Sequence, residues 1–279
     1  MLIPSIWTGM YAEMPLPKAL RILHDQGWTA FEASTEHLVQ IEIDTNPDAL
    51  IEGTRAYLTE HNLSMPQAHG LLGADVAQRD AEKREEDIKR LLRHIDIAAR
   101  MDVRAIVIHP GGKEIPTTRA GRKQIMVLNV AAFHRLGDAA GERGMRIGLE
   151  NLRRRGCATP HEMWELLDAI DHPALGITLD TSHANLVKLD IPATIREFAP
   201  KLIATHISDN DFSGDQHLTP GGGNIDWLGV MAAFREIGHE GLFNLEIPGE
   251  RHAVLPFRAM RSRFALEVAE WLVSAVHEL

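Results

Sequence analysis

The sequence predicts a single α/β domain that folds as a (β/α)8 barrel. Over its 279 residues, short apolar runs alternate eight times with longer amphipathic stretches, and this alternation is typical of parallel strands covered by helices. A carboxylate or an imidazole stands at the same end of seven of these runs, as expected where strands share one rim. Barrels of this length are commonly single domains, and no linker or low-complexity tract divides the chain, so we expect one domain over residues 1–279.

The eight predicted strands are short runs dominated by branched or small apolar residues. Such continuous runs are expected for strands that are buried on both faces of a parallel sheet. No G-x-G-x-x-G turn follows any of them, which favours a closed barrel over an open, dinucleotide-binding sheet. In chain order the strands cover residues 2–6, 29–33, 64–69, 104–109, 145–150, 174–180, 201–206 and 241–246.

Amphipathic stretches of about ten to twenty-five residues separate the strands and are predicted to be helices. Within 77–101, apolar residues recur at spacings of three and four and mark one face. A second helix is expected over 129–143, where the glycine that follows is placed to end it. Thr159 followed by Pro160 predicts an N-cap and the first helical position of a third helix. The last helix, over about 256–277, would complete the ring.

Charge and composition argue against several classes of protein. With 39 acidic and 29 basic residues the formal net charge is -10, so a surface that binds nucleic acid or an anionic membrane is not expected. The single cysteine, Cys157, permits no intrachain disulfide and no thiolate metal cluster. No apolar run approaches the ~18–20 residues that span a bilayer, and the N-terminus lacks the basic region of a signal peptide. We therefore expect a cytoplasmic protein.

Four of the strand-end residues form a set that favours a metal site. Glu150, Asp180, His206 and Glu246 end four consecutive predicted strands, each as the first polar group after several apolar residues. At one rim these groups would repel one another unless a divalent cation lay between them. The oxygen-rich set suits Mn²⁺, Mg²⁺ or Co²⁺ better than structural zinc, although Zn²⁺ also binds such residues. The competing interpretation is that each residue forms a salt bridge or caps a loop.

The other strand ends add Glu32, His69 and His109 to the same rim. Glycine or proline follows each of the two histidines, so the chain turns sharply there and keeps the imidazole at the rim. We expect His69 and His109 to contact a metal or the substrate. A buried histidine of the core is the alternative interpretation for each.

Three further residues lie in segments that follow the sixth and seventh strands. The Asp180-x-x-His183 spacing places the histidine just beyond its strand, where it would bind a second metal, contact the substrate or cap a helix. Asp215-x-His217 offers two more side chains to a metal or to the substrate. A charged surface loop is the competing interpretation for this second segment.

Three arginines, Arg153 to Arg155, follow the fifth strand almost directly. A guanidinium group matches the geometry of a phosphate or a carboxylate, so this segment offers a place for an acidic group of a substrate. Arg153, the nearest to Glu150, is the residue that we name for this role. Solvated surface charge is the alternative interpretation.

At these motifs the sequence resembles the xylose isomerase-like TIM barrels. This superfamily includes sugar phosphate isomerases and epimerases, ketose 3-epimerases, hydroxypyruvate isomerase, inosose dehydratase and the class II apurinic endonucleases. The matching segments run in the family's order along nearly the whole chain, and their combination is specific. They are AHG (68–70), IHPGG (108–112), GLENL (148–152), LDTSH (179–183), THISDN (205–210), DQHLTPGGGNIDW (215–227) and NLEIPGE (244–250).

The resemblance assigns the metal ligands to the four strand-end residues named first, and it implies that His183 lies near the substrate. The four ligands predict one metal ion. The endonuclease branch binds three zinc ions, so the resemblance permits up to three ions here. Basic, aromatic-rich loops that would grip a bent duplex are absent from the sequence, which favours a small sugar as the partner. The extra ligands of the endonuclease branch fall on His69, His109, His183, Asp215 and His217.

The resulting hypothesis is a metal-dependent sugar or sugar phosphate isomerase or epimerase. The metal would polarise a carbonyl and stabilise an ene-diolate, while Glu150 and Glu246 remove and return a proton. The alternatives are an inosose dehydratase-like lyase, a multi-zinc phosphodiesterase of the apurinic endonuclease kind, and a sugar-binding protein without catalysis. The sequence leaves both a monomer and a homo-oligomer open.

Overall fold

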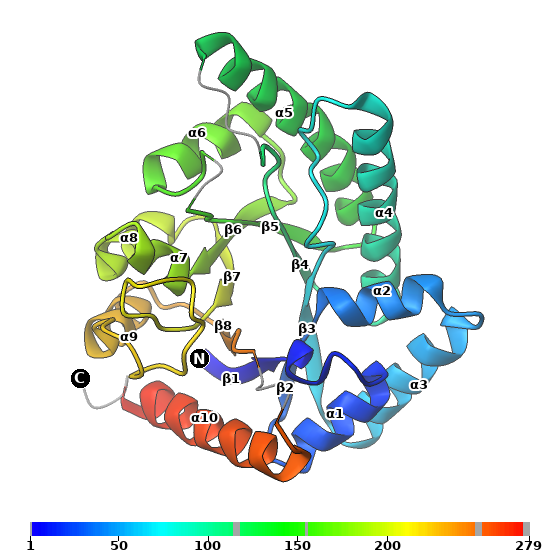
Figure 1. Cartoon of the computed structure of the whole chain (residues 1–279), viewed down its shortest axis with the longest axis vertical. Coiled ribbons are helices and arrows are strands. Elements are labelled where there is room, and N and C mark those ends of the chain that lie inside the picture. The colour runs from blue at the N-terminus through cyan, green and yellow to red at the C-terminus, as the bar shows by residue number, and fades with distance from the viewer. Residues whose placement is uncertain (1, 114–117, 154–155, 249–252, 276–279) are drawn as a thin grey trace.

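The computed structural model describes residues 2–113, 118–153, 156–248 and 253–275, and in Figure 1 it forms a ring of strands surrounded by helices. The eight strands pair in the order β7-β6-β5-β4-β3-β2-β1-β8, and each pair is parallel. At the rim, Ile207 N donates to Asn244 O and Glu246 N donates to Ile207 O, which joins the two ends of the sheet. The predicted (β/α)8 barrel is therefore confirmed.

The strands occupy the predicted runs to within one residue at each end. Their side chains are largely buried, as the continuous apolar runs predicted. The strands are β1 (Leu2–Trp7), β2 (Ala30–Ala33), β3 (Ser64–His69), β4 (Ala105–Ile108), β5 (Arg146–Glu150), β6 (Leu175–Asp180), β7 (Leu202–His206) and β8 (Gly241–Leu245).

The helices cover the outside of the barrel, with a short 3-10 helix, η1 (Thr8–Tyr11), after β1. Among the residues that the structure describes, no helix is both long and apolar enough to cross a membrane. The helices are α1 (Leu16–His24), α2 (Thr35–Ile43), α3 (Pro47–Glu60), α4 (Ala81–Arg100), α5 (Arg119–Gly141), α6 (Pro160–Ile170), α7 (Thr181–Leu186), α8 (Ile191–Phe198), α9 (Trp227–Glu236) and α10 (Leu255–Ala275).

Capping side chains explain where several helices begin. Thr159 caps α6 in a complete capping box with Glu162, as its Thr-Pro sequence predicted. Helix α4 begins at Ala81 rather than at 77, because the Asp80 carboxylate accepts from two backbone N–H groups there. Helix α5 begins at Arg119, ten residues before the predicted start at 129, and Thr118 caps it. The exposed, charged first turns of α5 carry no apolar periodicity that would reveal them.

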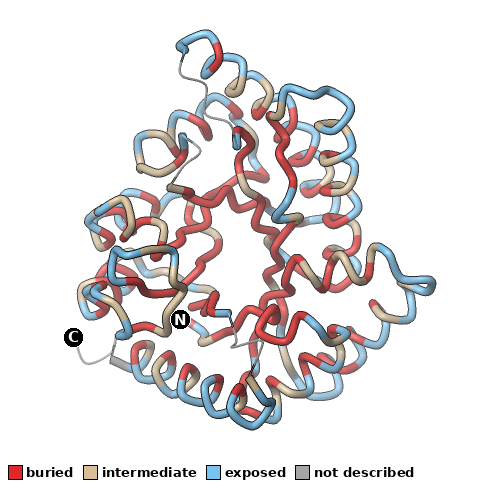
Figure 2. The backbone as a smooth tube through the Cα atoms, viewed as in Figure 1, coloured by how far each residue is buried: buried red, intermediate tan, exposed pale blue. Residues whose placement is uncertain are grey.

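The apolar core fills the space between the strands and the surrounding helices, and Figure 2 shows most of the strand ring as buried. Phe31 on β2 and Leu20 on α1 are both fully buried in this shell. The inside of the barrel near its rim differs, because it holds buried polar side chains such as Gln67 and Asn244. The fold therefore directs polar groups to one end of the barrel.

Candidate active site and metal centre

The four predicted metal ligands meet at the carboxyl rim of the barrel. Glu150, Asp180 and His206 are the last residues of β5, β6 and β7, and Glu246 follows β8 directly. The sheet register places Asp180 beside His206. The exposed fractions are 1% for Glu150, 0% for Asp180 and His206, and 9% for Glu246. Because parallel strands of a barrel end at one rim, the strand pattern alone brings these side chains together.

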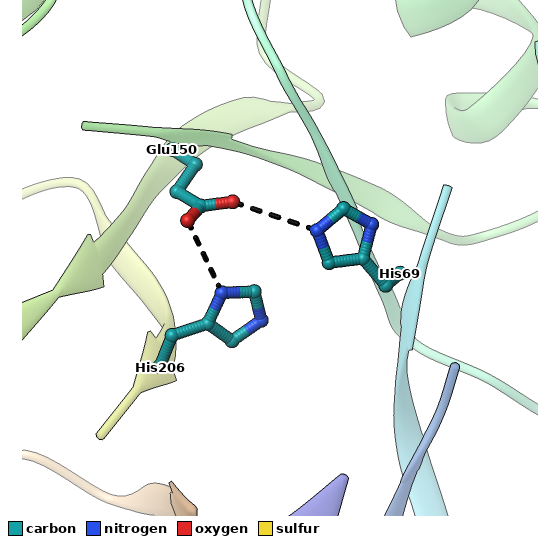
Figure 3. A group of neighbouring side chains, drawn as sticks. All are labelled: His69, Glu150 and His206. Carbon is teal, nitrogen blue, oxygen red and sulfur yellow. Dashed lines mark ion pairs between the residues drawn. The ribbon is translucent and has the colours of Figure 1, made fainter. Parts of the chain in front are cut away.

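One ring nitrogen, Nδ1 of His206, lies between two carboxylates. It is 3.4 Å from Glu150 Oε1 and 3.3 Å from Glu246 Oε2, and Figure 3 shows the Glu150 contact. One ligand atom from each of Glu150, Asp180, His206 and Glu246 lies within 4.8 Å of the other three. A divalent cation with bonds of about 2.0–2.2 Å to nitrogen and oxygen can bridge atoms at such separations.

Several buried atoms at this point have no hydrogen-bond partner in the part of the chain that the structure describes. They are His69 Nε2, Asp180 Oδ2 and His206 Nδ1. An unsatisfied buried polar atom costs roughly 1–3 kcal/mol, so such a cluster is unfavourable unless something binds it. The donor set of carboxylate oxygens and imidazole nitrogens fits Mn²⁺, Mg²⁺, Co²⁺ or Zn²⁺.

The carboxyl groups of the site differ in their affinity for protons. Burial opposes the charged form of Glu150, but His109 and His206 outweigh it and hold the pKa of Glu150 well below its usual range. Burial, together with repulsion from Glu150 and Asp180, raises the pKa of Glu246 to about 7. Burial also raises the pKa of Asp180. Near neutral pH, Glu150 is therefore ionised whereas Glu246 exchanges a proton readily.

His69 and His109 approach Glu150 from the strands β3 and β4, as predicted. Glu150 Oε2 is 3.6 Å from His69 Nε2 and 2.8 Å from His109 Nε2. His69 Nδ1 lies 2.8 Å from the Gly70 carbonyl, to which it donates, so its Nε2 lone pair faces the carboxylate. The His69 ring also stacks on His206 with centroids 5.4 Å apart (Figure 3). His69, Glu150 and His206 thus form a second group that can hold a cation.

A third group consists of Asp215, His183 and His217. Asp215 Oδ2 is 3.2 Å from His183 Nε2, and Asp215 Oδ1 is 3.4 Å from His217 Nε2. The Nδ1 atoms donate to the carbonyls of Asn151 and Glu246, at 2.9 Å each, so both Nε2 atoms are directed at the Asp215 carboxylate. A carboxylate between two ring nitrogens requires protons or a cation to neutralise the lone pairs.

The histidines of this third group have a high affinity for protons. Burial lowers the pKa of His183, but the charges of Asp180, Asp215 and Glu150 outweigh it and raise the pKa to about 10. Burial likewise opposes the charged form of His217, whose pKa is nevertheless raised by Glu246 and other carboxylates. The group therefore attracts positive charge, as a cation site does.

The Asp180 side chain also caps a helix beside the site. Its Oδ1 accepts from the backbone N–H of His183 at 2.7 Å and so caps helix α7, which begins directly after β6. This cap fixes His183 in the first turn of α7, one of the positions that its spacing from Asp180 predicted. Asn151 contributes as well, because its side chain bonds both the N–H and the C=O of Asp180.

The charge of Arg153 acts on Asp215 of the third group. Burial raises the pKa of Asp215, but His183, His217 and also Arg153 outweigh it and lower the pKa of this carboxyl. Arg154 and Arg155 lie outside the described residues. The role of Arg153 in binding an acidic substrate group stays a prediction.

Glu32 is the strand-end residue that does not join the ligand groups. Its carboxylate lies inside the barrel and contacts Nε2 of His206, on the opposite side of the ring from Glu150 and Glu246. Gln67 and Asn244 donate to it, and sequence reasoning did not find these two residues. Each stands two positions before a predicted strand-end ligand, on the same face of its strand, and this period-2 spacing is the signal that would have found them.

A family model described as xylose isomerase-like TIM barrel matches residues 20–274. An uncharacterized protein of Methanocaldococcus jannaschii is 32% identical over 166 residues, which cover 57% of this chain and 56% of that protein. The match thus spans little more than half of that relative. The ketose 3-epimerase of Arthrobacter globiformis is 26% identical over 245 residues, which cover 85% of this chain and 78% of that enzyme.

The solved structures agree with the fold. An L-ribulose 3-epimerase superposes with a TM-score of 0.82 and 17% identity, covering 100% of this chain and 96% of that one. At this identity the likeness establishes the shared architecture, and the eight-stranded closed barrel is its common element.

Proposed function

The chain belongs to the xylose isomerase-like TIM-barrel family, and we propose that it is a metal-dependent isomerase or epimerase of a sugar or sugar phosphate. The observation that carries the proposal is the approach of two buried glutamates, Glu150 and Glu246, to the same ring nitrogen of His206. Epimerisation at a carbon beside a carbonyl needs a proton-transferring group on each face of the substrate, and two glutamates at one site can meet this requirement. The similarity to a ketose 3-epimerase supports the same class of substrate.

In this proposal the two glutamates divide the proton transfer. The low pKa of Glu150 keeps its carboxylate ionised, which suits it to remove a proton from the carbon beside a carbonyl. Glu246, the second carboxyl group beside His206 Nδ1, would hold and return the proton. Return to the opposite face of the same carbon gives epimerisation, and return to the neighbouring carbon gives isomerisation.

The four-ligand set supports the metal dependence. Glu150, Asp180, His206 and Glu246 would hold the cation, since their ligand atoms lie within 4.8 Å of one another. When bound, a divalent cation polarises the substrate carbonyl and acidifies the adjacent C–H. These residues are nearly fully buried, and a site from which water is excluded would strengthen their interaction with the cation.

The test is solvent deuterium incorporation with a panel of ketoses and aldoses in D₂O, using protein supplied with Mn²⁺, Co²⁺, Mg²⁺ or Zn²⁺. Glu150→Gln and Glu246→Gln keep the size of each side chain and remove its proton transfer, so each is expected to lose at least about 100-fold in turnover. Glu142→Gln, at the exposed end of α5, is the matched control. Near-normal turnover in both site variants would sink the proposal.

A metal-dependent phosphodiesterase is the second candidate, because five further side chains surround the four-ligand set, each in contact with Glu150 or within the Asp215 group. Cleavage of an abasic oligonucleotide during a Zn²⁺ titration, abolished in Asp215→Asn, would favour this activity over sugar chemistry. A lyase that begins with the same proton removal is recognised by a product lighter by one water. The five side chains are His69, His109, His183, Asp215 and His217.

A further inference from the structure

A layer of polar side chains lies inside the barrel, beneath the candidate metal ligands. Such interiors are usually filled by branched apolar residues, but here four neighbouring strands contribute polar groups. These are Ser5 of β1, Glu32 of β2, Gln67 of β3 and Asn244 of β8, with exposed fractions between 0% and 3%. An ionised carboxylate in such a place costs several kcal/mol unless donors compensate it.

The carboxylate of Glu32 is compensated on both oxygens. Its Oε1 is 3.0 Å from His206 Nε2 and accepts from Gln67 Nε2 at 3.1 Å. Its Oε2 accepts from Asn244 Nδ2. Ser5 Oγ donates to Asn244 Oδ1 at 3.1 Å, which turns the amide so that its nitrogen faces Glu32. The whole layer is thus oriented toward one carboxylate.

The consequence for His206 follows from the two faces of its ring. A carboxylate accepts and does not donate, so the ring nitrogen beside Glu32 must carry the hydrogen. The other nitrogen, Nδ1, faces the site, where Glu150 Oε1 and Glu246 Oε2 lie 3.4 Å and 3.3 Å away, so a proton or a cation must lie between Nδ1 and these carboxylates. A histidine that binds a metal commonly donates its second N–H to a carboxylate, which fixes the ring and strengthens the ligand.

We propose that Glu32 is a positioning residue: it binds Nε2 of His206 and so orients the ring for cation binding through Nδ1. The proposal rests on the metal dependence in the proposed function and not on any sugar substrate. In this arrangement, Gln67 and Asn244 hold Glu32 in place. Because Glu32 touches neither the substrate nor the ligand atoms, it acts only through His206.

The test is the dissociation constant of Mn²⁺ and of Zn²⁺ for metal-stripped protein, measured by competition with a chromophoric chelator. Glu32→Gln is expected to weaken binding about 10- to 100-fold while leaving the free energy of unfolding of the metal-free protein unchanged or higher. In the same variant, the ¹⁵N shifts of the His206 ring are expected to change. Ser5→Ala, which removes one hydrogen bond of the layer but leaves the His206 contact, is the control and should bind within about threefold of the wild type.

Equal losses of affinity in Glu32→Gln and Ser5→Ala would overturn the proposal, because they would show a general packing defect. Unchanged affinity in Glu32→Gln would overturn it as well. The measurement uses no sugar, so a protein that binds metal normally but lacks isomerase activity would contradict the proposed function alone.

A second inference concerns the outer face of α10, which lies along the edge of the barrel with its outward side exposed (Figures 1 and 2). Phe257, Met260, Phe264 and Trp271 are spaced as one helical stripe and are 42%, 59%, 51% and 59% exposed. Each of these side chains exposes roughly 100 Å², so the stripe is about as large as the largest apolar patch of a typical monomer. Such a surface is characteristic of an interaction site.

We propose that this stripe, residues 257–271, is a contact between two copies of the chain with antiparallel α10 helices. Exposed Arg263 borders the stripe in its first half, and exposed Glu267 and Glu270 border the same flank in its second half. A two-fold axis one to two residues beyond Phe264 places each arginine opposite the glutamates of the other copy. This charge complementarity selects a second copy as the occupant.

Sedimentation velocity of the whole chain over a range of concentrations tests this contact. The wild type is expected to dimerise, and Phe264→Glu to be monomeric because two like charges would meet near the axis. Val127→Glu, at an exposed position of α5, is the control. Arg263→Glu should weaken the dimer, and adding Glu267→Lys and Glu270→Lys should restore it. A monomeric wild type, or a dimer that survives Phe264→Glu, would overturn the proposal.

Discussion

The two ring nitrogens of His206 face different parts of the molecule, one the rim of the barrel and the other its interior. Nδ1 lies among the carboxylates of Glu150 and Glu246, whereas Nε2 contacts Glu32. His206, at the end of β7, therefore contacts groups at the rim and groups in the barrel interior. Its chemistry depends on both neighbours, and only the rim neighbours were evident from the sequence.

The rim residues were predictable because a strand fixes both the position and the direction of its last side chain. His183 was predictable in the same way, since it follows Asp180 by a fixed spacing. The contacts within the barrel were not, because Glu32 meets Asn244 across 212 positions of the chain. Such a pairing depends on the register of the closed sheet, which no local pattern reveals.

Asp215 offers a residue-scale prediction in metal-free protein. Asp215→Asn is expected to lower the pKa of His183 from about 10, because one of the carboxylates that stabilise the imidazolium is lost. Asp180 remains in this variant, so the pKa of His183 should stay above the ordinary value of a histidine. The measurement is an NMR titration of the His183 ring. Asp211→Asn in the same loop, whose carboxylate accepts from Ser213 N, is the control, and an equal shift in both variants would contradict the assignment.

At the scale of elements, the strands were predictable from the sequence and the helix boundaries less so. Buried parallel strands are continuous apolar runs, so their ends are marked by the first polar residue. Helix α5 begins earlier than predicted, because its first turns are largely exposed and Thr118 supplies the cap. Helix α7 is only six residues long and begins directly after the site residue Asp180, so no periodicity marked it.

The close packing of β5 against β6 gives an element-scale prediction. A Cβ added at Gly148 would lie 2.1 Å from Thr178 Oγ1, so no side chain fits there without movement. Gly148→Ala is expected to reduce the free energy of unfolding in urea by about 1–3 kcal/mol. The double variant Gly148→Ala with Thr178→Ala removes the hydroxyl and should recover most of the loss. Equal stability of the single variant and the wild type would show that β5 and β6 separate without cost.

At the scale of the whole molecule, two buried histidines outside the site link folding to pH. Burial lowers the pKa of His37 and of His94 to about 4 each. An unfolded histidine has a pKa of about 6.5, so the unfolded chain takes up these protons first as the pH falls. The stability that these residues contribute is complete above about pH 6.5 and is lost progressively down to about pH 4.

Removing one of these histidines should therefore flatten the pH dependence of stability. His94→Gln keeps a donor for Glu42 and does not titrate, so its free energy of unfolding should fall less steeply between pH 6.5 and 4, by up to about 1.4 kcal/mol per pH unit. Urea unfolding of metal-free protein at several pH values measures the slope. His161→Gln, at an exposed position of α6, should leave the slope unchanged. A slope in His94→Gln equal to that of the wild type would falsify the linkage.

The most direct test of a metal centre at this rim is the metal content of the protein. Wild type and Glu246→Ala are exposed to Mn²⁺, Co²⁺, Mg²⁺ or Zn²⁺, freed of unbound metal by gel filtration, and measured by elemental mass spectrometry. If the four strand-end residues form a metal centre, the wild type should bind about one ion tightly per chain, and the variant should lose it. Two or three zinc ions per chain would instead raise phosphoester hydrolysis above sugar chemistry. The absence of bound metal from the wild type, or an equal metal content in both proteins, would contradict a metal centre that includes Glu246.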